Sequence, residues 1–184
     1  MKVKVGVSRL HVHLTEEDYQ ALFKDEVLEK RNDLTQPGQF ASNKTVDLVG
    51  KHTIEKVRVL GPLRNYTQVE VAVTDAYRLG INPPIRTSGD LDGAAVITIR
   101  NGENSITKPC CIIANRHIHI TKEDKERLQL NDVVKVKINN EKGAILDHVF
   151  LKVLDEAYFE LHLDTDDANA NLIKEGDEVE IINE

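Results

Sequence analysis

An internal repeat constrains the fold of this chain more than any other feature of its sequence. The segments Val5–Phe23 and Ile112–Leu130 match when their two His-x-His motifs are aligned. In each copy an alternation of apolar and polar residues leads into a Thr-x-x-Asp step and then into a helical pattern. Each copy therefore predicts a strand that carries His-x-His, a threonine helix cap and a short helix.

The rest of the chain consists of short strand-like runs separated by turn residues, a pattern typical of β-barrels or β-sandwiches. A short helix over Asp166–Lys174, capped by Thr165, is also predicted. The two halves of the chain resemble each other, and we place their boundary near Asn101–Pro109. Strands are predicted at Thr45–Val49, Lys56–Leu60, Gln68–Thr74, Ala95–Ile99, Val133–Ile138, Val149–Leu154, Phe159–Leu163 and Val179–Ile182.

Composition excludes several classes of partner. The 184 residues carry a net charge of −7 and only 4% aromatic residues, which argues against nucleic acid as a ligand. No apolar run approaches the roughly 18 residues of a membrane span, so no membrane partner is expected. Cys110 and Cys111 are adjacent and poorly placed to form a disulfide, which favours a reducing compartment and buried structural thiols.

The two His-x-His motifs are the strongest chemical signal. Residues i and i+2 of a strand point to the same face, so each pair could place two imidazoles on one metal ion, typically zinc. His162 lies in another alternating strand and could supply a third ligand, although a solvent-facing role is the simpler interpretation of that residue alone. His52 and His148 are interpreted as surface residues. The paired histidines are His11, His13, His117 and His119.

One further segment, Gly61–Val71, carries two candidate site residues. Arg64 lies at a turn and offers a rigid fork of donors suited to phosphate or carboxylate. Glu70 follows in the next strand and could bind a metal, but spacing alone favours a solvent-facing role. The usual dinucleotide, P-loop and hydrolase-elbow motifs are absent from the sequence.

Six separated motifs together resemble the PduL-type phosphate acyltransferases, also called phosphate propanoyltransferases. The resemblance covers nearly the whole chain, and the motifs occur in the order of that family. They are VGVSRLHVHL, QPGQFASNKTVDLVG, VRVLGPLRNYTQVEV, TDAYRLGINPPIRTSGDL, IIANRHIHITKED and ELHLDTDDANA.

The resemblance implies a mainly β fold with short helices, made of two closed β-barrels with a two-zinc active site between them. The first barrel repeat would span 1–105 and the second 106–184, with the N-terminal strand able to join the second barrel. Arg64 is assigned to phosphate, and Ser8, Ser88 and Asn169 are weaker pocket candidates. One zinc would be held by His11, His13 and Glu70, and the other by His117, His119 and His162.

The chain departs from the family at one place. Members usually read Ser-Asn-Arg-His before the first histidine pair, whereas this chain reads Ser8-Arg9-Leu10-His11, which puts a role for that arginine side chain in doubt. The chain also starts almost directly at its first strand, without the N-terminal extension that packages microcompartment members. We therefore expect a cytoplasmic enzyme, and whether it forms a homo-oligomer is left open.

The implied reaction converts an acyl-CoA and phosphate into an acyl phosphate and CoA, with acetyl or propanoyl as the acyl group. Zinc would polarise the thioester carbonyl, and Arg64 would hold the phosphate. Two alternatives stay open at this point. A dinuclear zinc hydrolase would use similar ligands to activate water, and a non-catalytic metal-binding module would keep the histidines without needing Arg64.

Overall fold

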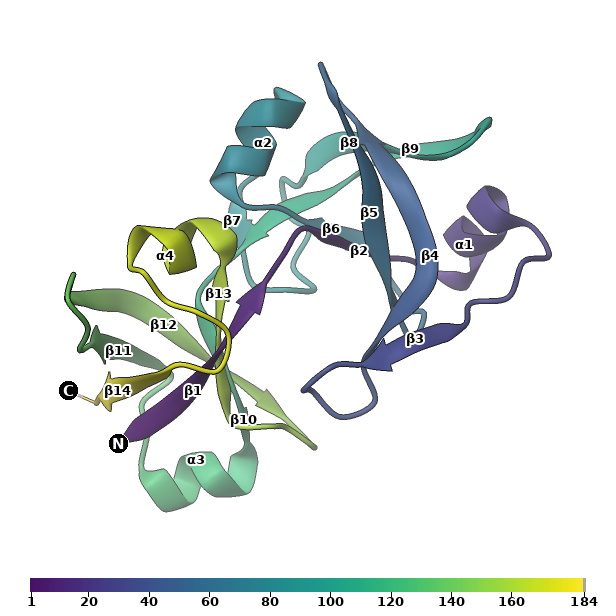
Figure 1. The fold of residues 1–184 in the computed structure, drawn as a ribbon. Coiled ribbons are helices and arrows are strands. Elements are labelled where there is room, and N and C mark those ends of the chain that lie inside the picture. Colours follow the sequence, from purple (N-terminus) through teal and green to yellow (C-terminus); the bar gives the residue numbers. More distant parts are fainter. Residues whose placement is uncertain (184) are drawn as a thin grey trace. The chain divides into compact units, whose positions relative to one another are not determined.

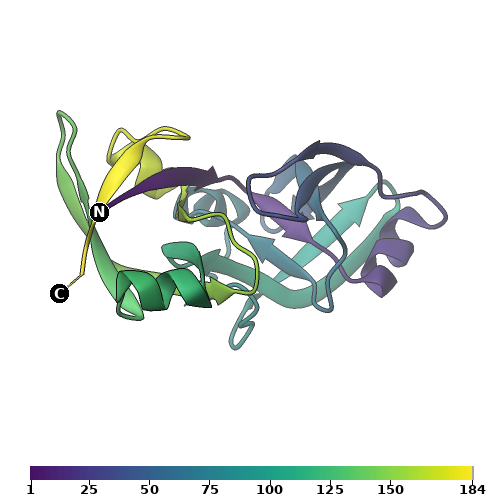
Figure 2. The same cartoon turned by 90° about the horizontal axis from the view of Figure 1, so that it is seen from below.

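The computed structural model describes residues 1–183 and divides them into two compact units. The continuous unit is Arg9–Ala114, and the split unit joins Met1–Ser8 to the described residues from Asn115 onward. Each unit encloses its own cluster of buried apolar side chains. The strands and helices of both units are drawn in Figures 1 and 2. Each unit therefore has a hydrophobic core of its own, as the internal repeat predicts.

The split unit is a closed six-stranded barrel with two helices. Helix α3 (Lys122–Leu128) packs against β10 and β12, and helix α4 (Thr165–Ala170) packs against β13 and β1 (Figure 1). Around the barrel the strands are β1 (Lys2–Ser8), β13 (Glu160–Asp164), β10 (His117–Thr121), β12 (Ala144–Leu154), β11 (Val133–Ile138) and β14 (Glu178–Ile182).

The continuous unit closes a second ring of six strands, because β8 pairs with both β4 and β9. The short strands β3 (Lys30–Asp33) and β7 (Ile85–Arg86) extend this sheet. Helix α1 (Glu16–Phe23) packs against β9 and β8, and helix α2 (Val73–Leu79) against β5. The ring consists of β4 (Phe40–Val49), β5 (Thr53–Gly61), β2 (His11–His13), β6 (Gln68–Glu70), β9 (Asn104–Ala114) and β8 (Ala95–Asn101).

The two rings share one pairing pattern. Strand β2 pairs in parallel with β5 and antiparallel with β6, just as β10 pairs with β12 and β13. In each repeat, however, the strand before His-x-His belongs to the other unit: β1 precedes β2 but closes the split barrel, and β9 precedes β10 but closes the continuous barrel. The predicted mainly β fold with two closed barrels is confirmed.

Threonine caps begin the helices that follow both histidine pairs, as predicted. The side chains of Thr15 and Thr121 accept hydrogen bonds from the backbone N–H three residues later, at 3.1 Å in each case. The predicted cap of the last helix is wrong. Asp164, at the end of β13, accepts from the N–H of Asp167 at 2.8 Å, so Thr165 lies inside the helix.

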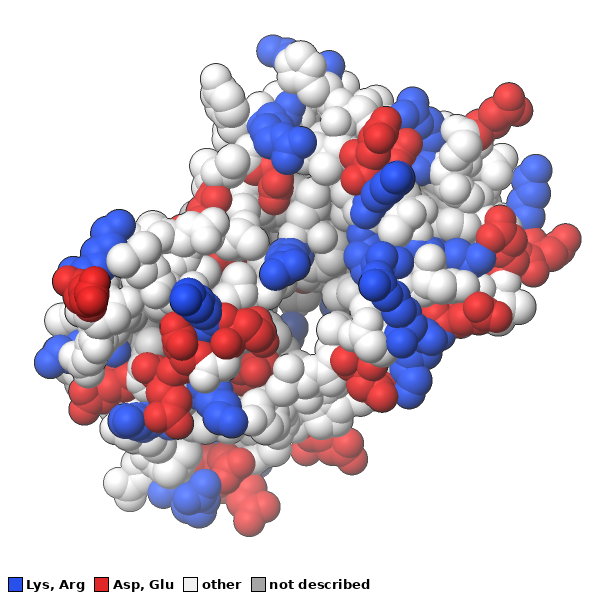
Figure 3. All heavy atoms as spheres, viewed as in Figure 1, with Lys and Arg blue, Asp and Glu red and all other residues white. Residues whose placement is uncertain are grey.

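Among residues 1–183, no helix combines the length and the apolar composition that a membrane crossing requires. The surface carries both signs of charge, with Lys and Arg side chains mixed with Asp and Glu over much of the visible face (Figure 3). Several of these charges are paired, for example Lys44 with Glu26 at 2.5 Å.

Candidate metal centres

Centre 1, the group His11, His13 and Glu70, lies in the continuous unit. Strand β2 places both histidines on one face, and the antiparallel register of β2 with β6 puts Glu70 directly opposite His11. The Nε2 atom of His11 lies 3.6 Å from Oε2 of Glu70, and both side chains are almost buried. The solvent-facing interpretation of Glu70 is therefore wrong.

Centre 2, the group His117, His119 and His162, occupies the equivalent position in the split unit. His162 on β13 lies opposite His117 on β10, as Glu70 lies opposite His11 in centre 1. The Nε2 atoms of His117 and His119 are 3.1 Å apart. The side chain of His162 is 21% exposed and packs against both other rings, so it is part of the cluster and not a solvent-facing residue.

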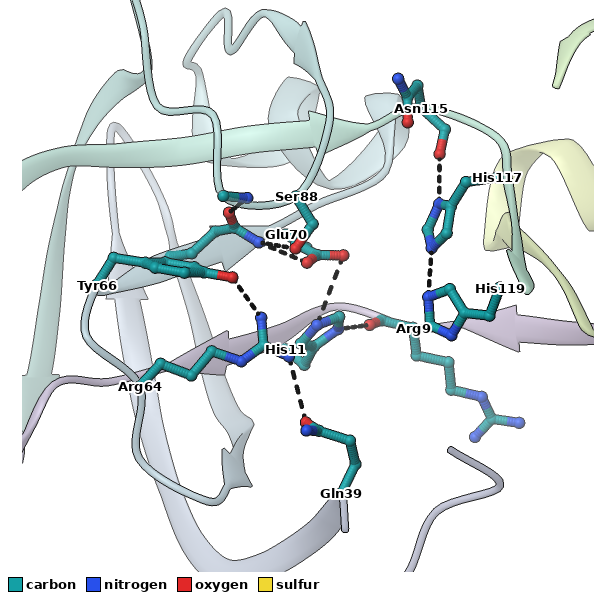
Figure 4. A network of polar contacts seen from close by, with 12 residues as sticks. Arg9, His11, Gln39, Arg64, Tyr66, Glu70, Ser88, Asn115, His117 and His119 are labelled. Carbon is teal, nitrogen blue, oxygen red and sulfur yellow. Dashed lines mark hydrogen bonds and ion pairs between the residues drawn. The ribbon is translucent and has the colours of Figure 1, made fainter. Parts of the chain in front are cut away.

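The first histidine of each pair is oriented in the same way. Nδ1 of His11 donates to the carbonyl of Arg9 at 2.7 Å, and Nδ1 of His117 donates to the carbonyl of Asn115 at 2.8 Å (Figure 4). Because a carbonyl only accepts, the proton lies on Nδ1 and leaves the Nε2 lone pair for a metal. This contact uses the backbone of Arg9, so the side chain there is not needed for it, while Leu10 packs against the core.

A buried amide that the sequence analysis missed holds Glu70. Gln68 is fully buried, and its Nε2 donates to Oε1 of Glu70 at 2.6 Å and to Oγ of Ser88 at 3.0 Å. The N–H of Gly89 donates to Oε1 of Gln68 at 2.8 Å. Gly89 has a φ of +100°, a backbone conformation that favours glycine. The Gly89 donor fixes which end of the amide faces Glu70. The place of Gln68 follows from the register of β6 with β2, which the sequence does not show.

Electrostatics near His11 favour its protonated form in the metal-free protein. Burial alone would lower the pKa of His11, but the charge and hydrogen bond of Glu70 outweigh it and raise the pKa above its ordinary value. The guanidinium of Arg64 opposes that rise, so its charge acts on the imidazole of His11. A divalent cation bound to His11 and Glu70 would take the place of this proton.

Arg64 is held by neutral partners. Its Nη1 donates to the hydroxyl of Tyr66 at 3.0 Å and its Nη2 donates to Oε1 of Gln39 at 3.2 Å, with the guanidinium 5.6 Å from the centre of the Tyr66 ring (Figure 4). The backbone N–H of Arg64 donates to the carbonyl of Leu14, just beyond the His-x-His strand. The arginine is thus fixed in place, and among residues 1–183 no carboxylate forms an ion pair with it.

The other candidates are more dispersed. Ser88 accepts from Gln68 in the continuous unit, whereas Ser8 ends β1 and Asn169 is exposed on α4 in the split unit. His52 and His148 are exposed, as predicted. Burial raises the pKa of both thiols, of Cys110 and of Cys111, to about 12, which confirms them as buried structural residues.

Both centres fit a zinc ion in donor type and spacing. Within each group the candidate ligand atoms lie no more than 4.8 Å apart. Ligands about 2.0–2.1 Å from a tetrahedral zinc are roughly 3.3 Å from one another, close to the 3.6 Å and 3.1 Å separations of centres 1 and 2. Three protein ligands, as each group provides, would leave a coordination position open for substrate.

The fold and these groups define a protein of two β-barrels, each with one metal-type centre. The sequence profile of the phosphate propanoyltransferase family matches residues 4–174. The chain belongs to this family and is an enzyme of the transferase class.

Relatives of known name agree with that assignment. The phosphate propanoyltransferase of Thermotoga maritima is 46% identical over 184 residues, covering 97% of this chain and 88% of the relative. That of Priestia megaterium is 46% identical over 180 residues, covering 95% and 83%. That of Limosilactobacillus reuteri is 44% identical over 173 residues, covering 91% and 81%.

Proposed function

We propose that this enzyme transfers a short acyl group, propanoyl or acetyl, reversibly between coenzyme A and phosphate. The observation that carries the proposal is the guanidinium of Arg64, which has neutral partners and acts electrostatically on His11 of centre 1. An arginine fork without a carboxylate partner is suited to phosphate. Family membership supplies the acyl and phosphate substrates.

We further propose that each centre holds one zinc ion, centre 1 through His11, His13 and Glu70 and centre 2 through His117, His119 and His162. A bound zinc supplies Lewis acidity, which favours negative charge on a carbonyl or phosphate oxygen. The hydrogen bonds from Nδ1 of His11 and His117 to backbone carbonyls support this use of Nε2 as the ligand atom.

The side chains of the continuous unit would position the phosphate for direct attack. Arg64 binds two phosphate oxygens, while Tyr66 and Gln39 keep its guanidinium in place. A phosphate oxygen forms a bond to the carbonyl carbon as the carbon–sulfur bond breaks, and CoA leaves as the thiolate. Cys110 and Cys111 are buried, so neither is suited to carry the acyl group, which favours direct transfer in a ternary complex. Ser8, Ser88 and Asn169 stay pocket candidates.

The reaction is tested by mixing the purified protein with propanoyl phosphate or acetyl phosphate and CoA and following thioester formation. We expect thioester in proportion to enzyme, no phosphate release when CoA is omitted, and no exchange of labelled phosphate into acyl phosphate without CoA. Phosphate release without CoA would identify a hydrolase, and the exchange reaction would indicate an acyl-enzyme. Either result would overturn the proposal.

Metal content is tested separately. Elemental analysis should find two zinc ions per chain, and removing one ligand from either centre, by His13→Ala or His119→Ala, should leave one. Chelation should abolish acyl transfer, and added zinc should restore it. A fully active preparation without transition metal would contradict the zinc proposal. The free cysteines favour a cytoplasmic setting, where thiols stay reduced.

A further inference from the structure

We infer that Glu160 is a positioning residue for centre 2. Its carboxylate accepts a hydrogen bond from Nε2 of His162 and so directs Nδ1 of that ring toward the metal. The inference rests on the proposed function, because it requires a zinc ion at centre 2. It gives His162 the opposite ring orientation from His117, whose Nδ1 donates to a backbone carbonyl.

The first support is the contact itself. Oε2 of Glu160 lies 2.9 Å from Nε2 of His162, and the Glu160 side chain is only 6% exposed. The two residues are two apart on β13, so both side chains lie on the face of the strand that carries centre 2. A carboxylate only accepts hydrogen bonds, so the shared proton belongs to the imidazole. Carboxylates that orient metal-binding histidines in this way are common beside zinc.

The second support comes from the internal repeat. By strand register, Glu160 lies opposite His119 as Gln68 lies opposite His13, two residues before the third ligand in both barrels. In centre 1 the third ligand is a carboxylate, and the neighbouring Gln68 donates to it. In centre 2 the third ligand is an imidazole, and the neighbour is the acceptor Glu160. In centre 1 the neighbour is the donor and the third ligand the acceptor, and in centre 2 these roles are reversed. The hydrogen bond between the two positions is therefore present in both barrels.

The third support is the glycine beside this pair. Gly6 on β1 pairs with His162, and the equivalent residue of the other barrel, Ile112, pairs with Glu70. A Cβ atom at Gly6 would lie 2.7 Å from Oε2 of Glu160 and 3.3 Å from Nε2 of His162. The split barrel thus has no side chain at the point where the Glu160 carboxylate contacts the His162 imidazole. Any residue larger than glycine at position 6 would displace the carboxylate.

The decisive experiment reads which imidazole nitrogen binds the metal. In zinc-loaded protein labelled with ¹⁵N-histidine, long-range ¹H–¹⁵N correlation spectra distinguish a metal-bound nitrogen from a protonated one. We expect a metal-bound Nδ1 and a protonated Nε2 for His162, with the reverse for His117. Zinc bound through Nε2 of His162 would overturn this inference and leave the zinc proposal intact, whereas a protein without zinc at centre 2 would overturn both.

Zinc affinity, measured by competition with a chromophoric chelator, provides an independent readout. Glu160→Leu should weaken binding at centre 2 by about 10–100-fold, the range for loss of an orienting partner. Glu160→Gln keeps an acceptor and should lose less, and Gly6→Ala should weaken binding by displacing an intact carboxylate. Glu156→Gln, the same charge change at an exposed position of the same unit, is the matched control.

Two results would contradict the positioning role. Wild-type zinc affinity in folded Glu160→Leu and Gly6→Ala proteins would show that the contact does not affect the metal. A loss in Glu160→Gln as large as in His162→Ala would show that Glu160 is itself a ligand. Because Gly6→Ala retains every polar side chain of centre 2, it keeps the test valid if Glu160→Leu does not fold.

Discussion

The two barrels have the same strand pairings, but the arginine near each centre has partners of a different kind. In the split unit, Arg116 precedes the histidine pair and forms a two-pronged ion pair with Asp167, at 2.7 and 2.8 Å. That ion pair, more than any other contact, raises the pKa of Arg116. In the continuous unit, the side chain of Arg64 donates to the neutral groups of Tyr66 and Gln39. One guanidinium is paired with a carboxylate, and the other is held by neutral groups.

This difference distinguishes an arginine that is held within the scaffold from the arginine that we propose binds phosphate. Arg116 joins the start of β10 to α4, so its charge stabilises the split barrel. The corresponding position of the first repeat is Leu10, which packs against the core of its own barrel. The first repeat therefore has an apolar contact where the second repeat has an ion pair.

The largest expected effect comes from removing the guanidinium of Arg64. Arg64→Ala should lower kcat/KM for acyl transfer by about 10²-fold or more, the order expected for loss of one donor that stabilises developing charge. Steady-state release of CoA from propanoyl-CoA, with phosphate varied, measures this effect. Zinc content should stay at the wild-type level, because Arg64 is not a ligand.

Arg78→Ala is the matched control, since Arg78 is exposed on α2 of the same unit. It should leave the kinetics unchanged. If Arg64→Ala kept wild-type kcat/KM for phosphate, the contrast between the two guanidiniums would have no functional meaning, and the non-catalytic interpretation of centre 1 would gain support.

Local physics made most of the strands and both threonine caps predictable. Alternating apolar residues gave β11 its predicted bounds and placed β8, β13 and β14 to within a few residues. The edge strand Lys30–Asp33 was missed because all four residues are exposed and none is apolar. The predicted strand at Gln68–Thr74 was too long, because α2 begins at Val73.

Long-range pairing was harder to predict. The exchange of β1 and β9 between the barrels depends on contacts far apart in the sequence. The family resemblance indicated that the N-terminal strand could join the second barrel, but no residue of either strand by itself identifies its partner. The histidine pairs were visible from spacing, whereas the position of Glu70 opposite His11 follows from register alone. The supporting partners Gln68 and Glu160 were missed for the same reason.

The second largest expected effect comes from removing Gln68, the donor that holds Glu70 of centre 1. Gln68→Leu removes the donor to Glu70 and leaves Ser88 and the N–H of Gly89 without that amide. Zinc affinity at centre 1 should fall by about 10–100-fold, with centre 2 unchanged. Chelator competition in a protein whose centre 2 is removed by His119→Ala isolates the change.

Gln20→Leu, on α1, is the control for the loss of an amide whose hydrogen bond is exposed. Equal zinc affinities for Gln68→Leu and wild type would mean that backbone register alone positions Glu70. A positioning role would then hold for Glu160 at most, and the proposed equivalence of Gln68 and Glu160 would be contradicted.

The smallest expected effect tests a second difference between the barrels, at the helix caps. Asp18 of α1 is buried and accepts from Thr67 and from Lys108 at 2.6 Å, so it ties the cap to the residue before β6 and to β9. Its counterpart Asp124 of α3 instead pairs with Arg127 on the same helix, at the surface. The ion pair at this cap is therefore half-buried in the continuous barrel and exposed in the split barrel.

Asp18→Asn should lower the free energy of unfolding by about 1–3 kcal/mol at neutral pH, as expected when hydrogen bonds to a charged group are weakened. Burial opposes ionisation of Asp18, but hydrogen bonds from Lys108 and Thr67 outweigh it and lower the pKa below its ordinary value. A lowered pKa stabilises the protein above the unfolded pKa of about 4, and that stability is lost as pH falls through the folded value. Urea unfolding followed by circular dichroism should thus show the two proteins converging below about pH 4, with a much smaller difference for Asp124→Asn at every pH. A gap between wild type and Asp18→Asn that stayed constant down to pH values below the folded pKa would mean that the charge of Asp18 contributes nothing and that its packing alone stabilises the cap.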